Sequence, residues 1–82
     1  MTQTLIRWRL AEVMARHKVS SKDLALELDI SSNAVGNLKS ADTMPRIDGK
    51  RLEQICDAIS KLSRISERVS PHDLLEWKPE DY

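Results

Sequence analysis

Residues 19–40 read VSSKDLALELDISSNAVGNLKS and hold two short amphipathic patterns with a three-residue gap between them. Ser20 and Ser31 precede the two patterns, and serine is a favoured residue at a helix N-cap. The apolar positions recur at helical spacing. They are Leu24, Ala25, Leu28, Ile30, Val35 and Leu38. The stretch therefore predicts helices over residues 21–28 and 32–39 that cross closely, with little room at Ala25 for a larger side chain.

The outward side of the second predicted helix carries Asn33, Gly36 and Asn37, without the charge pattern of an ordinary solvated face. Asparagine side chains suit bidentate hydrogen bonding to base edges, and a solvated polar face is the alternative. Gly36 is unusual in the middle of a helix, where glycine costs about 1 kcal/mol relative to alanine. There are two alternative explanations for a glycine at this position. Either a ligand approaches the backbone closely there, or the glycine has no functional meaning.

Helical periodicity continues on both sides of this stretch. A first helix is predicted over residues 3–17 and a fourth over residues 49–62, where Asp48 is placed to cap the N-terminus. The inward positions of these two helices are Ile6, Leu10, Val13, Met14, His17, Leu52, Ile55, Cys56, Ile59 and Leu62.

A last short helix is predicted after residue 69, with Ser70 at the N-cap and Pro71 at the first helical position. Three residues are expected to dock it on the others: Leu74, Leu75 and Trp77. The expected fold class is therefore all-α. It is a five-helix bundle that forms one domain over residues 1–77, followed by a C-terminal tail over residues 78–82.

Composition excludes several function classes. The 82-residue chain has only two glycines, too few for a phosphate-cradling loop, and helical spacing brings no Ser-His-Asp set or carboxylate pair together. Cys56, the single cysteine, lacks metal-ligand spacing to His17 and His72 and fits a reducing compartment. No apolar run approaches the roughly 18 residues of a membrane span, and the N-terminus lacks a signal-peptide core. We expect a cytoplasmic binding protein that is not an enzyme and uses no metal or cofactor.

Charge is balanced over the whole chain but unevenly distributed along it. The formal net charge is zero. Residues 1–51 carry nine Lys and Arg against six Asp and Glu, whereas residues 52–82 carry four against seven. A basic N-terminal part joined to an acidic C-terminal part favours one face for a polyanion and another face for a different contact.

Read without a gap, residues 19–40 resemble the helix-turn-helix of the Cro/CI-type (lambda-repressor-like) DNA-binding family. The segment LEQICDAI at residues 52–59 is similar to the helix that follows this motif in the family. The likeness covers residues 5–77 and implies a lambda-repressor-like bundle that binds double-stranded DNA sequence-specifically. It also implies a small transcriptional regulator, a repressor rather than an activator, that is nucleoid-associated when bound to DNA.

Several positions depart from the family pattern. Asp29 stands where the family most often has glycine in the turn, and aspartate tolerates left-handed backbone better than most residues. Ser21 stands where a glutamine often braces a phosphate. Lys39 and Met14 stand where a Glu–Arg pair is common, so both partners are replaced together. Lys39 is thereby left as a cation near the expected DNA face.

In the docking that the resemblance implies, the second helix of the motif lies in the major groove, and this assigns roles position by position. The expected base contacts are Ser32, Asn33 and Asn37. The expected phosphate contacts are Ser20, Ser21, Lys22, Lys39, Ser40 and Arg46. For each of these residues, an ordinary solvated position is the alternative.

A second function class stays open, because the same fold can serve as a protein-interaction module such as an antitoxin or an adaptor. The neutral net charge favours this alternative, whereas the uncharged outer face of the helix at residues 32–39 favours DNA. Binding to random-sequence duplex that weakens steeply with salt would separate the two classes.

Trp8 is predicted on the outer side of the first helix, almost opposite its core stripe. Large aromatic side chains left in water tend to mark interfaces. Two interpretations stay open. Either the chain's own end, residues 77–82, folds back over Trp8, or Trp8 forms a two-fold contact in a homodimer, with or without the C-terminal helix. The residues expected at such a contact are Trp8 and Trp77.

Overall fold

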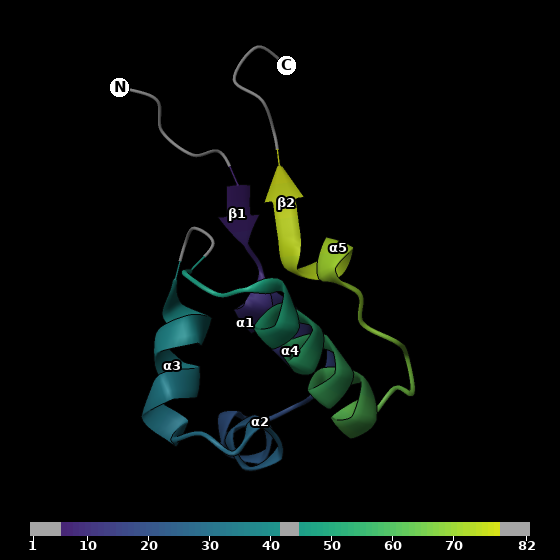
Figure 1. The fold of residues 1–82 in the computed structure, drawn as a ribbon. Helices are drawn as coiled ribbons and strands as arrows, with labels where there is room; N and C mark the ends of the chain where they lie inside the picture. The colour runs from purple at the N-terminus through teal and green to yellow at the C-terminus, as the bar shows by residue number, and fades with distance from the viewer. Residues whose placement is uncertain (1–5, 42–44, 78–82) are drawn as a thin grey trace, which may run out of the picture.

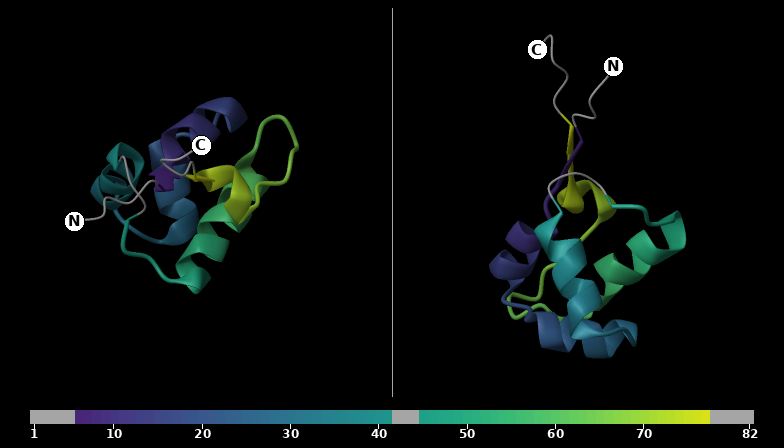
Figure 2. Two further views of the ribbon diagram at one scale, coloured as in Figure 1. Left: turned by 90° about the horizontal axis from the view of Figure 1, so that it is seen from above. Right: turned by 90° about the vertical axis from the view of Figure 1, so that its left-hand side faces the viewer.

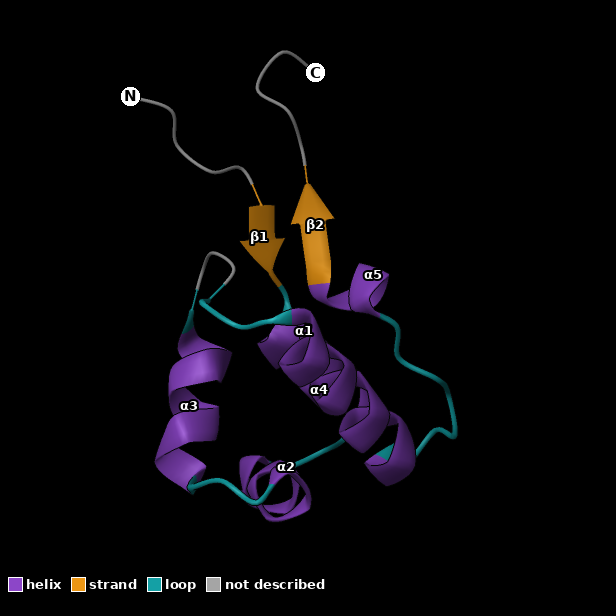
Figure 3. Cartoon of the chain, in the orientation of Figure 1, coloured by secondary structure: helices purple, strands orange, loops and turns teal. Residues whose placement is uncertain are grey.

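The computed structural model describes residues 6–41 and 45–77 of the chain. Five helices and two short strands lie in these residues, and Figure 1 shows how they are arranged. In chain order they are β1 (Ile6–Trp8), α1 (Leu10–His17), α2 (Ser21–Leu28), α3 (Ser32–Ser40), α4 (Gly49–Leu62), α5 (Pro71–Leu74) and β2 (Leu75–Trp77). Figure 3 shows that the helices form the body of the molecule and that both strands lie at one end of it.

The helix-turn-helix formed by α2 and α3 follows its prediction to within one residue at each boundary. The Ser20 hydroxyl oxygen accepts the backbone N–H of Asp23 at 3.1 Å, and that of Ser31 accepts the N–H of Ala34 at 3.0 Å. Both serines therefore cap the helices as predicted. Asp29 adopts a left-handed φ of 57°, which confirms that aspartate can occupy this turn position.

The hydrophobic core joins all five helices and β1. Its most deeply buried side chains are mainly aliphatic: Leu10, Met14, Leu24, Val35, Ile55, Ile59, Val69 and Leu74. Ala25 is buried among them, as expected for a close helix crossing, while Leu28, Ile30 and Leu38 pack against the core and stay partly exposed. α4 has its predicted bounds, and Asp48 caps it as predicted.

The first helix begins later than predicted. α1 begins at Leu10, and Ile6–Trp8 form the strand β1 instead of continuing the helix. Residues 3–5 lie outside the described part of the chain. The spacing from Ile6 to Leu10 fits a helix, but pairing with a strand far away in sequence fixes this segment in an extended form. The predicted inward positions within α1 are buried: Leu10, Val13, Met14 and His17.

β1 and β2 form a two-stranded antiparallel sheet, which corrects the all-α fold class to a helical bundle with a small sheet. The register pairs Ile6 with Trp77, Arg7 with Glu76, and Trp8 with Leu75. Directly opposite residues share one face of a sheet, so the apolar pairs lie on one face and the charged pair on the other. Figure 2 shows the sheet standing out from the helical body.

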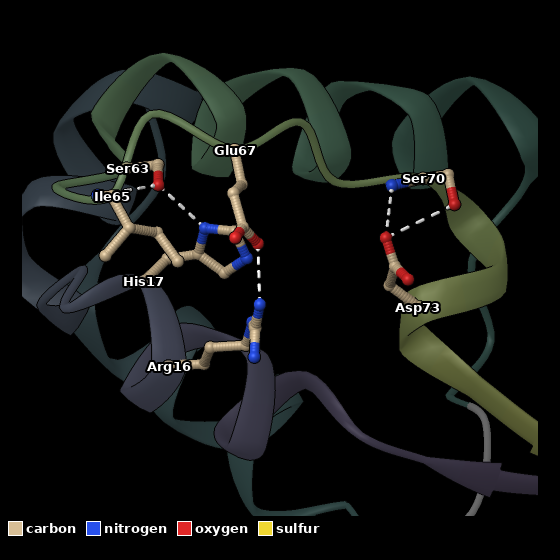
Figure 4. A network of polar contacts seen from close by, with 7 residues as sticks. All are labelled: Arg16, His17, Ser63, Ile65, Glu67, Ser70 and Asp73. Atoms are coloured by element: carbon tan, nitrogen blue, oxygen red, sulfur yellow. Dashed lines mark hydrogen bonds and ion pairs between the residues drawn. The ribbon is translucent and has the colours of Figure 1, made fainter.

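The C-terminal helix is shorter than predicted. α5 is a single turn, in which the Asp73 carboxylate accepts the N–H of Ser70 at 2.9 Å and its hydroxyl at 3.3 Å (Figure 4). Leu74 is fully buried, but Trp77 belongs to β2 and is 70 % exposed. Its predicted docking against the bundle is therefore wrong. The predicted tail, residues 78–82, lies outside the described residues.

Polar contacts fasten the connector between α4 and α5 to the end of α1 (Figure 4). The Arg16 guanidinium donates to the Glu67 carboxylate at 2.7 Å, and the N–H of Arg64 donates to the His17 carbonyl at 3.0 Å. The buried His17 ring is joined through Nδ1 to the Ser63 hydroxyl at 2.7 Å. His17 is thus a satisfied structural residue that holds the connector in place.

Candidate nucleic-acid interface

α3 presents a polar face to solvent that is uncharged except for Lys39 at its edge. The exposed residues that share this face are Ser32, Asn33, Gly36, Asn37 and Ser40. The opposite side of the helix packs into the core through Val35 and Leu38. The structure therefore brings the three predicted base-contacting residues together on one accessible surface, held by a buried apolar stripe.

Gly36 lies in the middle of this face and has no structural requirement for glycine. Its backbone φ is not positive, and a methyl group added at its Cα would meet no atom within 4 Å beyond the adjacent residues and the surrounding backbone of α3 itself. Neither conformation nor packing within the chain explains why a helix-destabilising residue stands there. Close approach by an external molecule and a change without functional meaning remain the two explanations.

The cations predicted to hold phosphates are exposed and have no ion pair with any other described residue. They are Lys22, Lys39 and Arg46. The ion pairs of the described chain involve other cations: Arg7 with Glu12 and Glu76, Arg9 with Glu12, Arg16 with Glu67, Lys61 with Glu27, and Arg68 with Asp57. The three predicted phosphate cations are consequently available to an external anion. Binding it would break no ion pair of the described residues.

One contact joins the two helices of the motif beside this face. Lys39 Nζ lies 3.5 Å from Ser21 Oγ, a long hydrogen bond that brings the end of α3 to the first turn of α2. The first-turn N–H groups of a helix lack backbone partners within the helix and attract anions. In α2 the Ser20 cap occupies that of Asp23, which leaves those of Ser21 and Lys22. Lys39, Ser21 and the adjacent Lys22 thus gather at a surface suited to a phosphate.

The other two predicted phosphate serines have roles within the helices. The Ser20 oxygen accepts the N-cap hydrogen bond of α2, and the Ser40 hydroxyl donates to the Asn37 carbonyl at 3.3 Å. Arg46 lies in the segment that leads into α4 and is not part of the helix-turn-helix. Contact of Ser20, Ser40 and Arg46 with phosphates stays a prediction.

Trp8 is not on the outer surface where it was predicted. It is only 5 % exposed, and its indole N–H donates to the Leu38 carbonyl, at the end of α3, at 2.9 Å. The premise for a two-fold contact through Trp8 is therefore wrong. The residue directly opposite Trp8 in the sheet is Leu75, which lies before the predicted covering segment, residues 77–82. Trp77 pairs with Ile6 instead, and residues 78–82 lie outside the described residues.

The contact between Trp8 and α3 is the feature of the interface that the sequence did not reveal. The only signal lies in two similar triplets, Ile-Arg-Trp at residues 6–8 and Leu-Glu-Trp at residues 75–77, which alternate apolar and charged residues. Such alternation is the strand pattern, but three residues are too few to distinguish it from part of a helix.

Cys56, the single cysteine, is a buried free thiol. Burial raises the pKa of the Cys56 thiol to about 11, so this side chain stays protonated at neutral pH and acts as a small apolar residue. Residues 6–41 and 45–77 contain no group of three or more His, Cys, Asp or Glu side chains that could hold a metal ion. Within the same residues, no helix has the length and apolar character needed to cross a membrane.

A family model described as the Cro/C1-type HTH DNA-binding domain matches residues 9–80, which include all five helices. Comparisons with curated proteins and with solved structures gave no match. The matched range contains α2 and α3 with their serine caps and the exposed polar face of α3. From the resemblance of residues 19–40, the observed geometry and this match, the chain belongs to the Cro/C1-type helix-turn-helix DNA-binding domain family.

Proposed function

We propose that the protein is a sequence-specific transcriptional regulator that reads the major groove of double-stranded DNA with α3. The observation that carries the proposal is the exposed, uncharged face with Ser32, Asn33 and Asn37 on the second helix of the motif. An asparagine amide can bond adenine bidentately, and a serine hydroxyl can pair with either kind of base edge. In this docking mode the N-terminal residues of the second helix point toward the bases.

Phosphate contacts would fix the register of α3 on the duplex. Lys22, Lys39 and Arg46 supply unpaired charge, and Ser21 with the first-turn amides of α2 supplies hydrogen-bond donors. Such contacts carry no sequence information, so they position the helix while its asparagines discriminate among bases. Loss of a phosphate contact should therefore weaken binding to every sequence, whereas loss of a base contact should change the sequence preference.

We propose repression as the mode of regulation and the cytoplasm as the location, with the protein on the nucleoid when bound. Repression needs only that a site be occupied, whereas activation needs a further productive contact with another protein. The single cysteine fits a reducing compartment.

The salt dependence of binding to random-sequence duplex tests this function. Each neutralised phosphate contributes about −0.9 to the slope of log K against log salt, so three cations predict a slope of about −3. Lys22→Gln should reduce the steepness by about 1, while Lys61→Gln should not, because Lys61 is paired with Glu27 at 2.7 Å. A wild-type protein that binds no duplex even at low salt would refute DNA binding.

The alternative function is a protein-interaction module, such as an antitoxin or an adaptor, built on the same fold. Two observations favour it: the net charge of zero and the exposed Trp77 side chain. The uncharged face of α3 and the unpaired cations beside it favour DNA. The salt experiment separates the two functions, because a protein-binding module has no reason to lose duplex affinity with a slope set by phosphates.

Gly36→Ala should change stability and DNA affinity in opposite directions. The unfolding free energy should rise by about 0.5–1 kcal/mol, because alanine favours the helix and its methyl group meets open space. Affinity for a specific duplex should fall if the backbone at Gly36 approaches the groove. Thermal melting and duplex titration of the same variant measure both effects. A more stable variant with unchanged affinity would show that Gly36 has no functional role.

We further propose that the protein binds DNA as a homodimer with Trp77 at the contact. A two-fold assembly would supply two copies of α3 for half-sites about one helical turn, roughly 34 Å, apart. It would also keep the acidic C-terminal part away from phosphates. In sedimentation on a palindromic duplex, Trp77→Ala should lose the dimer, whereas Leu26→Ala, which removes another exposed apolar side chain, should retain it. A wild type that stays monomeric at high concentration and binds one-to-one would contradict the dimer.

A further inference from the structure

The C-terminal end of α3 lacks the local cap that ends the two preceding helices. After α1 and α2, Lys18 and Asp29 adopt left-handed conformations, each with a φ of 57°, and backbone N–H groups return to the last carbonyls. After α3, Ala41 is extended, with a φ of −71° and a ψ of 132°. Its N–H reaches the Leu38 carbonyl only at 3.4 Å. The Asn37 carbonyl accepts the Ser40 hydroxyl at 3.3 Å, but the Leu38 carbonyl has only the long bond from Ala41 within this segment and can take another donor.

The side chain of Trp8 supplies that partner from 30 residues away. Its Nε1–H donates to the Leu38 carbonyl at 2.9 Å, which is shorter than the bond from Ala41. The indole is buried, and a buried indole N–H usually requires an acceptor. Each group thus satisfies the other: the helix end gains a donor and the indole gains an acceptor.

The strand that carries Trp8 is itself anchored. Trp8 lies opposite Leu75 in the sheet, and the N–H of Arg9 donates to the carbonyl of the buried Leu74 at 2.8 Å. The indole therefore belongs to a part of the molecule formed by β1, α5 and β2, outside the helix-turn-helix. It connects this part to the end of α3.

We propose that Trp8 is a positioning residue that clamps the C-terminal turn of α3 and so sets the placement of the side chains that read and hold DNA. The inference rests on the proposed function, because Leu38 lies between Asn37, a predicted base contact, and Lys39, a predicted phosphate contact. Loss of the indole donor frees the last turn of α3 to fray. Fraying there moves Asn37 and Lys39 while leaving the first turn, held by the Ser31 cap, in place.

The clamp is tested without DNA by amide hydrogen exchange of Trp8→Phe. Phenylalanine keeps an aromatic ring in the core but has no donor for the Leu38 carbonyl. We expect exchange at residues 38–41 to become three- to tenfold faster, the range that corresponds to losing one net hydrogen bond. The matched control is Ile59→Val, a modest truncation of a fully buried residue on α4, which should leave these amides unchanged relative to the rest of α3.

Duplex titration of the same variants tests the consequence for DNA. Trp8→Phe should bind a selected duplex about three- to tenfold more weakly and discriminate less well against random duplex, by no more than the same factor, whereas Ile59→Val should bind within about twofold of wild type. If the wild type binds no duplex, the proposed function fails, and the exchange measurement still decides whether the clamp exists.

A measurement on the wild type keeps the proposal testable if Trp8→Phe does not fold. The indole N–H of Trp8 should exchange with solvent at least tenfold more slowly than that of Trp77, which is largely exposed. The variant Trp77→Phe assigns the two signals. Equal exchange of the two indoles would overturn the proposal. The proposal would also be overturned if Trp8→Phe folds and does not differ from Ile59→Val, either in amide exchange at residues 38–41 or in duplex affinity.

Discussion

Asn37→Ala is expected to weaken binding to a selected duplex by about 1–3 kcal/mol and to relax the preference at one base position. Asn37 is exposed on the polar face of α3, one turn from Asn33. Its amide can both donate to and accept from an adenine edge, and alanine can do neither. The loss should therefore be large for the selected sequence and small for random duplex.

Two further variants separate base reading from other causes. Lys39→Ala should weaken all duplexes alike and flatten the salt slope, because a phosphate contact has no sequence preference. Gln54→Ala removes a side-chain amide from an exposed position on α4 and should leave affinity unchanged. If Asn37→Ala keeps the sequence preference of the wild type, the assignment of Asn37 to a base contact is wrong.

Ala25→Leu is expected to lower the unfolding free energy by about 1–3 kcal/mol, because added methyl groups in a filled core force neighbouring side chains and backbone apart. Ala25 is buried on α2 beside the turn into α3, and its carbonyl accepts the N–H of Ile30 at 3.0 Å. For a domain of this size, each kcal/mol should lower the melting temperature by about 4–8 °C. Thermal unfolding followed by circular dichroism measures the shift.

The control for this prediction is Ala15→Leu, the same exchange at an exposed position of α1. A surface substitution of this kind usually changes stability by no more than about 0.5 kcal/mol. If Ala25→Leu has the same melting temperature as the wild type and Ala15→Leu, α2 and α3 do not pack closely at Ala25.

The helix-turn-helix could be predicted from the sequence because its boundaries depend on neighbouring residues. Ser20, Ser31 and Asp48 each cap a helix through a hydrogen bond to an amide three residues away. Asp29 tolerates the left-handed turn by its own side-chain chemistry. Caps and turns of this kind are local, so a single sequence is sufficient to place them.

The small sheet could not be predicted in the same way, because its strands depend on each other. Residues 6–8 and 75–77 are extended only through pairing across almost the whole chain. The spacing from Ile6 to Leu10 fits a helix equally well, and in a helix Trp8 would point to solvent. The position of Trp8 against Leu38 is therefore determined by the tertiary structure and does not follow from the local sequence.

The predicted site likewise has features that follow from local sequence and features that do not. Exposure of Ser32, Asn33 and Asn37 follows from the amphipathic pattern of α3 and is confirmed. Ser20 and Ser40 each make a hydrogen bond at a helix end, and the same hydroxyl groups would have to contact an external phosphate. The sequence pattern alone does not show these bonds. Contact of any of these residues with DNA stays a prediction, because it depends on a partner molecule.

Selection of bound duplexes from a random-sequence DNA library tests most directly whether the protein reads DNA through α3. The wild type should enrich a defined sequence, and Asn37→Ala should enrich the same sequence with one position relaxed. A wild type that retains duplexes but enriches no sequence would contradict sequence-specific reading. A wild type that retains no duplex at low salt would contradict DNA binding altogether.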